Sequence, residues 1–148
     1  MVADDIILLC SYPDSELKLK LLRDLVGSVR STTPIPIALA THYPVPEDII
    51  RSVDYFIYDA DDRPGSNYIV SYHHTIPNDV RISTTRITPY HALSCLSSIK
   101  NGATFLRNKY RNLHYFEHDS IINFPRYLSI FKDKLKDAKF TGMLYDVP

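Results

Sequence analysis

An α/β fold with a mostly parallel sheet is predicted by features of the first 60 residues. Residues 6–10 form a continuous apolar run, which is typical of a strand buried on both faces. Two more strand-like runs follow at 34–40 and 54–59, and helix-like segments separate the three runs. Strand, helix, strand, helix and strand in this order predict parallel strands joined by right-handed crossovers.

The first predicted helix begins near Asp14 or Ser15, because either side chain can cap a helix N-terminus. Its apolar side chains fall on one stripe: Leu17, Leu21, Leu22, Leu25, Val26 and Val29. The second predicted helix is short and covers residues 46–51, with Pro46 suited to its first turn.

The middle of the chain has a weaker pattern. Residues 63–67 predict a loop, and residues 68–72 and 80–84 predict short strands or extended chain. His73 and His74 are adjacent, and adjacent side chains in extended chain point in opposite directions. We therefore expect exposed loop histidines rather than a shared metal site.

The longest helix is predicted to begin at Pro89 and to run to about Lys109. Its apolar stripe consists of Leu93, Leu96, Ile99, Ala103 and Leu106. Gly102 indicates either a close contact with the sheet or a weak point in the helix. Beyond the next strand, residues 126–136 predict a helix and residues 138–145 a last strand.

Composition narrows the functional classes. The 148 residues predict one domain, and 17 basic residues balance 17 acidic ones, so no net charge favours nucleic acid or anionic membrane as a partner. Cys10 and Cys95 lie in apolar runs without metal-site spacing, so we expect buried free thiols and a reducing, cytoplasmic compartment. The start does not resemble a signal peptide, and no apolar run has the length of a membrane span.

A pair of carboxylates follows an apolar and aromatic run at residues 113–116. Glu117 and Asp119 are two residues apart, so in a strand both side chains point to one side. Like charges at that separation repel unless a cation lies between them. Mg²⁺ or Mn²⁺ suits oxygen ligands of this kind and often carries phosphates on its open positions. The alternative is a buried strand that simply ends in a polar turn.

Polar and aromatic residues follow the three predicted parallel strands, at 11–13, 42–44 and 59–62. Ligands of such sheets bind beyond the carboxyl ends of the strands. An aromatic ring there can stack on a base, and a carboxylate can accept hydrogen bonds from a ribose or a base. Ordinary turn chemistry is the alternative for each loop taken alone.

The long helix leads into the acidic strand, so its first turns are expected near the same site. Tyr90, His91 and Ser94 would then lie close to bound phosphates, which the N-terminal end of the helix dipole also favours. For His91, a capping or surface role is the alternative.

Taken together, SYP after the first strand, DYFIYD at the third, and the helix YHALSCLSSIKNGATFLRNKY running into LHYFEHDS resemble the donor-binding half of a GT-A glycosyltransferase. The resemblance covers residues 5–123 and implies a three-layer α/β/α sandwich of the Rossmann-like, nucleotide-diphospho-sugar transferase type. In that family an acid-x-acid motif holds Mn²⁺ or Mg²⁺ on the diphosphate of a nucleotide sugar. Here Glu117 stands in place of the first Asp of that motif.

The resemblance also implies roles for individual residues. Glu117 and Asp119 would be the metal ligands, and the residues that line the nucleoside would be Ser11, Tyr12 and Pro13. Asp59 would lie at the base or the ribose. The donor sugar and phosphates would be contacted by Tyr90, His91, Ser94 and His118.

The implied function is transfer of a sugar from a UDP- or GDP-sugar to a glycan, protein or lipid acceptor. Enzymes of this type usually continue well past the motif, so we expect residues 1–148 to be one domain that lacks most of the acceptor-binding part. No catalytic base is assigned among Asp133, Asp137 and Asp146.

Two other functions remain open at this point. A metal-dependent phosphohydrolase or nucleotidyltransferase would use the same two carboxylates, with His73, His74 or His118 assisting. A non-catalytic binding module would have kept the fold and lost the chemistry.

Overall fold

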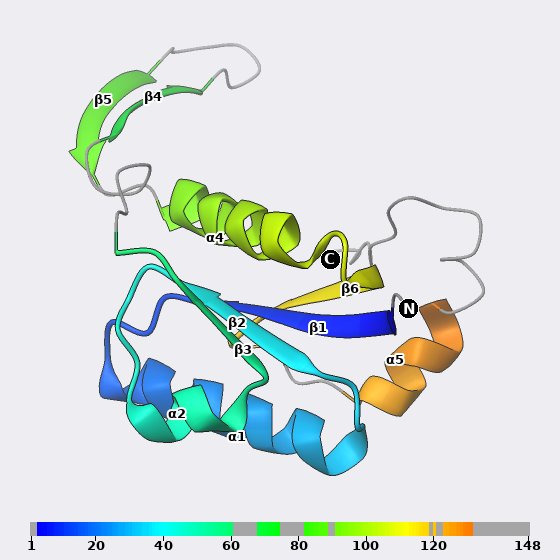
Figure 1. The fold of residues 1–148 in the computed structure, drawn as a ribbon. Helices are drawn as coiled ribbons and strands as arrows, with labels where there is room; N and C mark the ends of the chain where they lie inside the picture. The colour runs from blue at the N-terminus through cyan, green and yellow to red at the C-terminus, as the bar shows by residue number, and fades with distance from the viewer. Residues whose placement is uncertain are drawn as a thin grey trace.

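The predicted α/β fold with a parallel sheet is confirmed. The computed structural model describes residues 3–60, 68–74, 82–88, 91–118, 120 and 123–131. Four strands form one parallel sheet in the order β3-β2-β1-β6 (Figure 1). Their bounds are Ala3–Ser11 for β1, Ile37–Thr41 for β2, Tyr55–Tyr58 for β3 and Tyr110–Glu117 for β6.

Helices lie on both faces of this sheet (Figure 1). Three of them share one face: α1 (Glu16–Thr32), α2 (Glu47–Ser52) and α5 (Phe124–Phe131). The opposite face is covered by α4 (His91–Leu106). No helix of the described ranges is long and apolar enough to cross a membrane.

The centre of the hydrophobic core is β1. Its residues from Ile6 to Leu9 are fully buried, as the continuous apolar run predicts. Alternate side chains point to opposite faces, so Ile7 and Leu9 pack in the cluster that contains α1, and Ile6 and Leu8 pack in the cluster that contains the end of α4. One strand therefore joins two separate layers of core.

Helix α1 begins where its cap predicts. Ser15 is the N-cap, and its side chain accepts a hydrogen bond from the backbone N–H of Lys18 at 3.4 Å. The buried residues are Leu22, Leu25, Val26 and Val29. Leu17 was predicted in the same stripe but is 67 % exposed, because the first turn of the helix extends beyond the sheet-covered core.

The buried stripe of α4 differs from the prediction. Its described buried residues are Ser94, Ser98, Gly102 and, as predicted, Leu106, whereas Leu96 is 59 % exposed. The side chain of Leu93 lies outside the described part. Small residues allow the helix backbone to approach the sheet. A Cβ atom at Gly102 would lie 2.7 Å from Cδ1 of Leu8, so the close-contact interpretation of Gly102 is confirmed.

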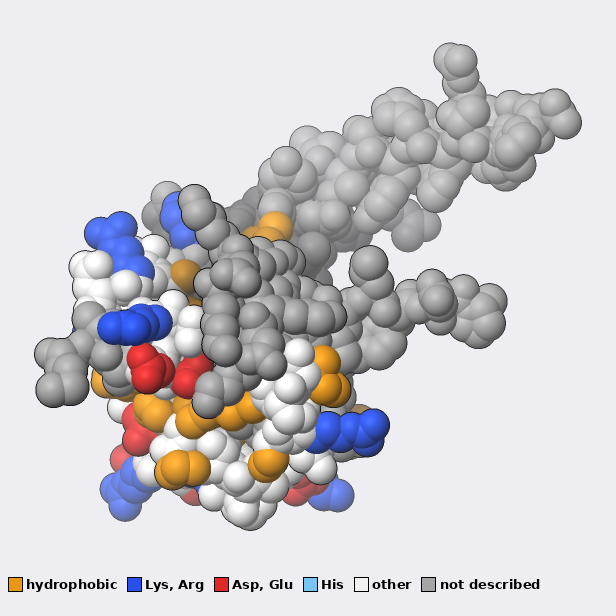
Figure 2. All heavy atoms as spheres, turned by 90° about the vertical axis from the view of Figure 1, so that its right-hand side faces the viewer, with side chains coloured by type: hydrophobic (Ala, Val, Ile, Leu, Met, Phe, Trp, Pro, Cys, Tyr) orange, Lys and Arg blue, Asp and Glu red, His pale blue; other side chains and the backbone are white. Residues whose placement is uncertain are grey.

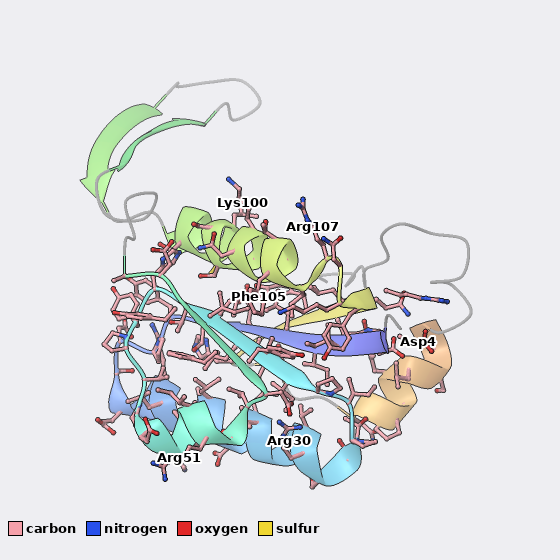
Figure 3. The ribbon with its side chains drawn as sticks, in the orientation of Figure 1. Asp4, Arg30, Arg51, Lys100, Phe105 and Arg107 are labelled. Carbon is pink, nitrogen blue, oxygen red and sulfur yellow. The ribbon has the colours of Figure 1, made fainter. Side chains whose placement is uncertain are left out.

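Charged side chains in α4 and directly after it lie on the outer side. Lys100 of α4 and Arg107, which follows the helix, point away from the sheet (Figure 3). The side of the molecule that carries α5 and the start of β1 shows basic and acidic side chains around a short hydrophobic band (Figure 2). Both signs of charge are mixed there, as the balanced composition predicts.

The strand before the acidic pair is less buried than predicted. Among the described strands, β6 pairs only with β1, so it forms an edge of the sheet. Leu113 is 36 % exposed, and His114 is the residue of β6 that is buried. The apolar run predicts a buried strand, and this holds only in part, because an edge strand has one open side.

Two further strands form a separate antiparallel pair, β4 (Tyr68–His74) and β5 (Ile82–Thr88). Extended chain was predicted here, and it is found. His73 and His74 lie at the end of β4, opposite Ser83 and Ile82, rather than in a loop. The predicted loop at 63–67 lies outside the described residues.

Near the C-terminus, α5 begins two residues before the predicted helix start at Arg126. The described part of this helix ends at Phe131, and the predicted last strand at 138–145 lies outside the described residues.

A buried hydrogen-bond network attaches α5 to the sheet. Nε2 of His114 lies 2.9 Å from Oδ1 of Asp5, and Nδ1 lies 3.3 Å from the Tyr127 hydroxyl. In the tautomer whose Nε2–H donates to the Asp5 oxygen, Nδ1 accepts from the Tyr127 hydroxyl. Burial raises the pKa of Tyr127, so its hydroxyl keeps the proton that it donates.

Two Gly→Ala variants test the close contact between α4 and β1. Ala at Gly27 meets nothing within 4 Å and should stabilise α1 by about 1 kcal/mol through helix propensity. Ala at Gly102 must displace the buried Leu8, and overpacking costs about 1–3 kcal/mol. Denaturant unfolding should therefore show Gly102→Ala to be less stable than Gly27→Ala by at least about 1 kcal/mol. Equal stability of the two variants would contradict the close packing.

Tyr127→Phe tests the network that holds α5. The variant removes the hydroxyl that bonds Nδ1 of the buried His114, so the free energy of unfolding should fall by about 1 kcal/mol. Ser129→Ala, at an exposed position on the same helix, should change it by less than about 0.5 kcal/mol. If Tyr127→Phe were as stable as the control, the hydrogen bond from Tyr127 would not hold α5 to the sheet.

Candidate functional site

The topology predicts where a ligand would bind. The chain adds β2 and β3 on one side of β1 and then returns to place β6 on the other side. At such a reversal, the loops after the two neighbouring strands diverge and leave a crevice beyond their carboxyl ends. In this chain that position lies beyond Ser11 of β1 and Glu117 of β6.

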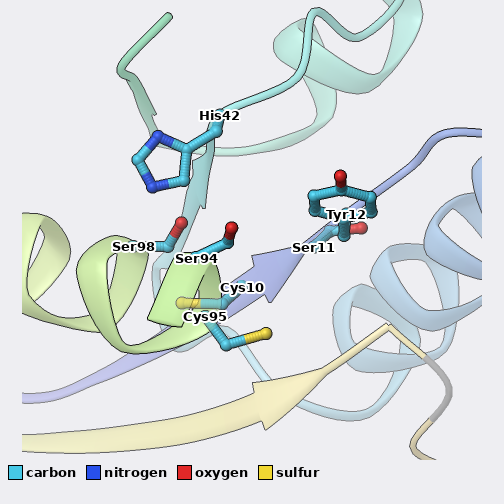
Figure 4. A pocket seen from close by; sticks show the side chains of 7 residues that line it. All are labelled: Cys10, Ser11, Tyr12, His42, Ser94, Cys95 and Ser98. Atoms are coloured by element: carbon cyan, nitrogen blue, oxygen red, sulfur yellow. The ribbon is translucent and has the colours of Figure 1, made fainter. Parts of the chain in front are cut away.

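A pocket of about 190 Å³, including the part that opens to solvent, lies at the carboxyl ends of the strands (Figure 4). Its enclosed part has room for a water-sized group. It is lined from the end of β1, the start of the loop after β2 and the first half of α4, by Cys10, Ser11, Tyr12, His42, Ser94, Cys95 and Ser98.

The most constrained polar group in the pocket is the imidazole of His42. The residue is only 6 % exposed, and its Nδ1 lies 2.8 Å from the backbone carbonyl oxygen of Asp59. Because a carbonyl only accepts, Nδ1 carries the proton, and Nε2 of the neutral ring is an acceptor. Nε2 is buried and has no hydrogen-bond partner among the described residues.

The serines of α4 form the facing wall. Ser94 and Ser98 are 2 % and 4 % exposed, and they lie one helical turn apart on the side of α4 that faces the sheet. Figure 4 shows the His42 ring beside the Ser98 and Ser94 hydroxyls. An acceptor nitrogen and two hydroxyls therefore border the same small space.

Tyr12 and Tyr43 form an aromatic pair, and Tyr12 lines the pocket. The rings of Tyr12 and Tyr43 have centroids 4.1 Å apart and are tilted by 57°. The Tyr43 hydroxyl donates to the Tyr12 hydroxyl, and the Tyr43 N–H donates to Oγ1 of Thr41 at 2.9 Å. The Lys18 ammonium lies 5.3 Å from the Tyr12 centroid. These contacts hold Tyr12 in place while leaving it half-buried.

Glu117 joins the acidic motif to the pocket. In the β1–β6 register it lies opposite Cys10, a pocket-lining residue, and its side chain is exposed. Its carboxylate accepts a hydrogen bond from the Tyr115 hydroxyl at 2.8 Å. Burial, followed by this bond to Glu117, raises the pKa of Tyr115, so the phenol remains a donor.

The remaining acidic-motif residues are only partly described. Asp119 lies outside the described residues, and His118 is half-buried in the turn that follows β6. Within the described ranges, no three His, Cys, Asp or Glu side chains gather in an arrangement that could hold a metal ion. The metal role of Glu117 and Asp119 therefore stays a prediction.

Asp59 fixes the end of β3 against its neighbours. Its N–H donates to the Thr41 carbonyl at 3.1 Å, and its carboxylate accepts from Nδ2 of Asn101 at 3.1 Å. Its own carbonyl holds His42. The predicted contact of this carboxylate with a base or ribose is not tested by these bonds.

The structure brings some of the predicted residues together. Ser11, Tyr12 and Ser94 line one pocket, and Pro13 is buried beside it. Strand alternation, however, places the Ser11 side chain on the α1 face, and in Figure 4 its hydroxyl points away from His42. His91 begins α4, but its side chain is outside the description, as is Tyr90 entirely.

Sequence reasoning placed the loop at 42–44 near the site but assigned no role to His42, and it did not single out Cys95 or Ser98. A signal for His42 was present: it directly follows β2, with even spacing from Ala38 and Ala40, whose side chains face α4. Even spacing along a strand indicates a shared face.

The two cysteines are free thiols, as predicted, but only Cys10 is buried. Burial, with smaller contributions from Cys95 and Glu117, raises the pKa of the Cys10 thiol far above its ordinary value. Cys95 is half-buried. Cys10 is therefore a packing residue at the base of the pocket rather than a nucleophile.

Comparison of the chain with protein-family models, with curated proteins and with solved structures found no match. Its function is therefore inferred from the geometry of the site.

Thiol labelling tests the burial of Cys10. In a Cys95→Ser variant, a thiol reagent at pH 8 should label the folded protein at least about tenfold more slowly than the unfolded protein, because the buried thiol is protonated and shielded. Rapid labelling of the folded variant would show that the base of the pocket is open to solvent.

Proposed function

We propose that this chain is a nucleotide-sugar-binding domain of the GT-A glycosyltransferase type, which uses Mn²⁺ or Mg²⁺ and a UDP- or GDP-sugar. The observation that carries the proposal is the position of the pocket. It lies beyond the carboxyl ends of parallel strands, beside the point where the strand order reverses, and Glu117 adjoins it. Nucleotides bind at this position in open parallel sheets.

The nucleoside would bind at the mouth of the pocket. Tyr12 supplies a half-buried ring, already fixed by Tyr43, on which a base can stack. Asp59, at the end of β3, is the candidate partner of the ribose or base. The sequence therefore places an aromatic ring and a carboxylate at the ends of two different strands, as nucleoside binding requires.

The diphosphate would lie between the acidic motif and the start of α4. The N-terminal end of this 16-residue helix favours an anion, and Ser94 offers a hydroxyl there. His91 is the candidate basic residue toward the donor, and His118 follows the motif directly.

The donor set of the motif fits the proposed ion. Carboxylate oxygens are the ligands that Mg²⁺ and Mn²⁺ prefer, and Glu117 presents its carboxylate at the surface. When bound, such an ion neutralises charge on the diphosphate leaving group. Glu117 and Asp119 would hold it, and the hydrogen bond from Tyr115 would orient the Glu117 carboxylate.

The reaction would be transfer of a sugar to an acceptor hydroxyl. The bond from the anomeric carbon to the diphosphate breaks, a bond to the acceptor oxygen forms, and a base takes the hydroxyl proton. The chain's contribution would be to orient the donor and to exclude water from the pocket. No described residue is assigned as that base.

A thermal-shift panel tests the proposal. UDP, GDP, CDP and their sugars are added with Mn²⁺, Mg²⁺ or EDTA to the wild type and to Asp119→Asn and Glu117→Gln. A nucleotide at a hundred times its Kd should add about 2.7 kcal/mol, which raises Tm by several degrees. The shift should require the metal and be lost in both variants.

Asp24→Asn, which removes an exposed carboxylate of α1, should behave like the wild type. No shift with any nucleotide, in a protein that melts cooperatively, would overturn the proposal and favour a module without nucleotide chemistry. Hydrolysis of a nucleotide that carries no sugar would favour the phosphohydrolase function instead.

A further inference from the structure

We propose that His42 selects the base of the nucleotide by accepting its ring N–H, and so favours uracil and guanine over cytosine and adenine. The inference rests on the proposed function, and it concerns a residue that the acidic motif does not include. His42 would be a specificity-determining residue of the pocket.

The first support is the fixed tautomer of His42. The Asp59 carbonyl takes the Nδ1 proton, so the ring presents an acceptor at Nε2. This nitrogen is buried, lines the pocket and has no partner among the described residues. A buried acceptor without a donor costs free energy, which a ligand N–H or O–H would recover.

The second support is the electrical character of the pocket. Among the described residues, its lining consists of hydroxyls, thiols, the Tyr12 ring and His42, with no Lys, Arg, Asp or Glu. A phosphate would gain no cation there. The group that enters is therefore neutral, which matches the edge of a base rather than the diphosphate.

The third support is a hydroxyl beside Nε2. Ser98 is buried and faces the pocket from α4, so its hydroxyl can donate to a carbonyl oxygen next to the ligand N–H. The enclosed part of the pocket has room for a water-sized group, far less than the roughly 300–1,000 Å³ of a typical site for a whole ligand. One edge of the base would enter it, beside Tyr12.

Nucleobases differ at that edge. Uracil at N3 and guanine at N1 carry an N–H next to a carbonyl, which complements an acceptor beside the Ser98 hydroxyl. Cytosine at N3 and adenine at N1 present a lone pair, which would face the lone pair of Nε2. The proposal therefore predicts that UDP or GDP binds more tightly than CDP and ADP.

The test is calorimetric titration of the full chain with matched variants and ligands. In His42→Asn the amide N–H can still donate to the Asp59 carbonyl, but no atom occupies the Nε2 position. In His42→Gln the amide oxygen can reach that position and accept. The nucleotide that binds the wild type is compared with its ring-methylated form, N3-methyl-UDP or N1-methyl-GDP, which lacks the N–H.

His42→Asn should weaken binding of the parent nucleotide about tenfold, which is about 1.4 kcal/mol, and His42→Gln should recover part of the loss. Methylation should weaken binding to the wild type by a similar factor and should have no effect on His42→Asn. If methylation weakens binding to the wild type but not to His42→Asn, the variant and the methyl group disrupt the same contact, that between Nε2 and the ligand N–H. A purely structural role of His42 would not produce this result.

Equal affinity of His42→Asn and wild type for UDP or GDP would overturn the inference and leave the proposed function standing. Failure of the wild type to bind any nucleotide would overturn both. If the methylated nucleotide binds as well as its parent while a 2′-deoxy form loses affinity, His42 contacts ribose and the base-selection proposal is wrong. The methylation comparison uses wild-type protein, so it decides the matter even if His42→Asn does not fold.

Discussion

The structure depends on the position of β1 between two parallel neighbours. Its fully buried residues, from Ile6 to Leu9, take part in the core on both faces of the sheet. Because β2 pairs on one side and β6 on the other, the carboxyl end of β1 is the point where the chain reverses its direction across the sheet. The candidate site lies at that point.

The packing of α4 links this core to the site. Gly102 allows the helix to lie directly against Leu8, and the same stripe continues through Ser98 to Ser94 at the pocket. Gly102 permits close packing near the end of α4, and Ser98 and Ser94 place hydroxyl groups in the pocket near its start. One surface of α4 serves both stability and the candidate site.

The two halves of the candidate site have different chemical character. His42, Tyr12 and the serines of α4 form a neutral pocket, whereas Glu117 stands exposed at its edge on the neighbouring strand. This separation suits a ligand with a neutral end and a charged end. A nucleoside diphosphate has both, which is why the proposed function and the role of His42 support each other.

Much of the fold could be predicted because continuous apolar runs and a capping Ser are strong local signals. The run at Ile6–Cys10 and the cap at Ser15 are the clearest cases. Hydrophobic periodicity predicted the α4 stripe only in part: Leu106 is buried as predicted, but Leu96 is exposed and the stripe also contains Ser and Gly. Periodicity detects apolar stripes, and it cannot detect a helix that packs closely through small residues.

The candidate site was predictable only in part, for a similar reason. The ends of β1 and β6 could be located from the sequence, because carboxyl ends of parallel strands share one edge. The role of His42 could not, since it depends on a hydrogen bond to the Asp59 carbonyl from another strand. Likewise, the exposure of Leu113 follows from the edge position of β6, which sequence does not reveal.

The most direct test of the account is NMR mapping of the binding site. Backbone amide shifts of the labelled chain would be followed as UDP or GDP is added with Mg²⁺. The account predicts chemical-shift changes at Tyr12, His42 and Glu117, and none at Asp5 or Thr32, near the opposite ends of the strands. Changes confined to those opposite ends, or no changes with either nucleotide, would contradict it.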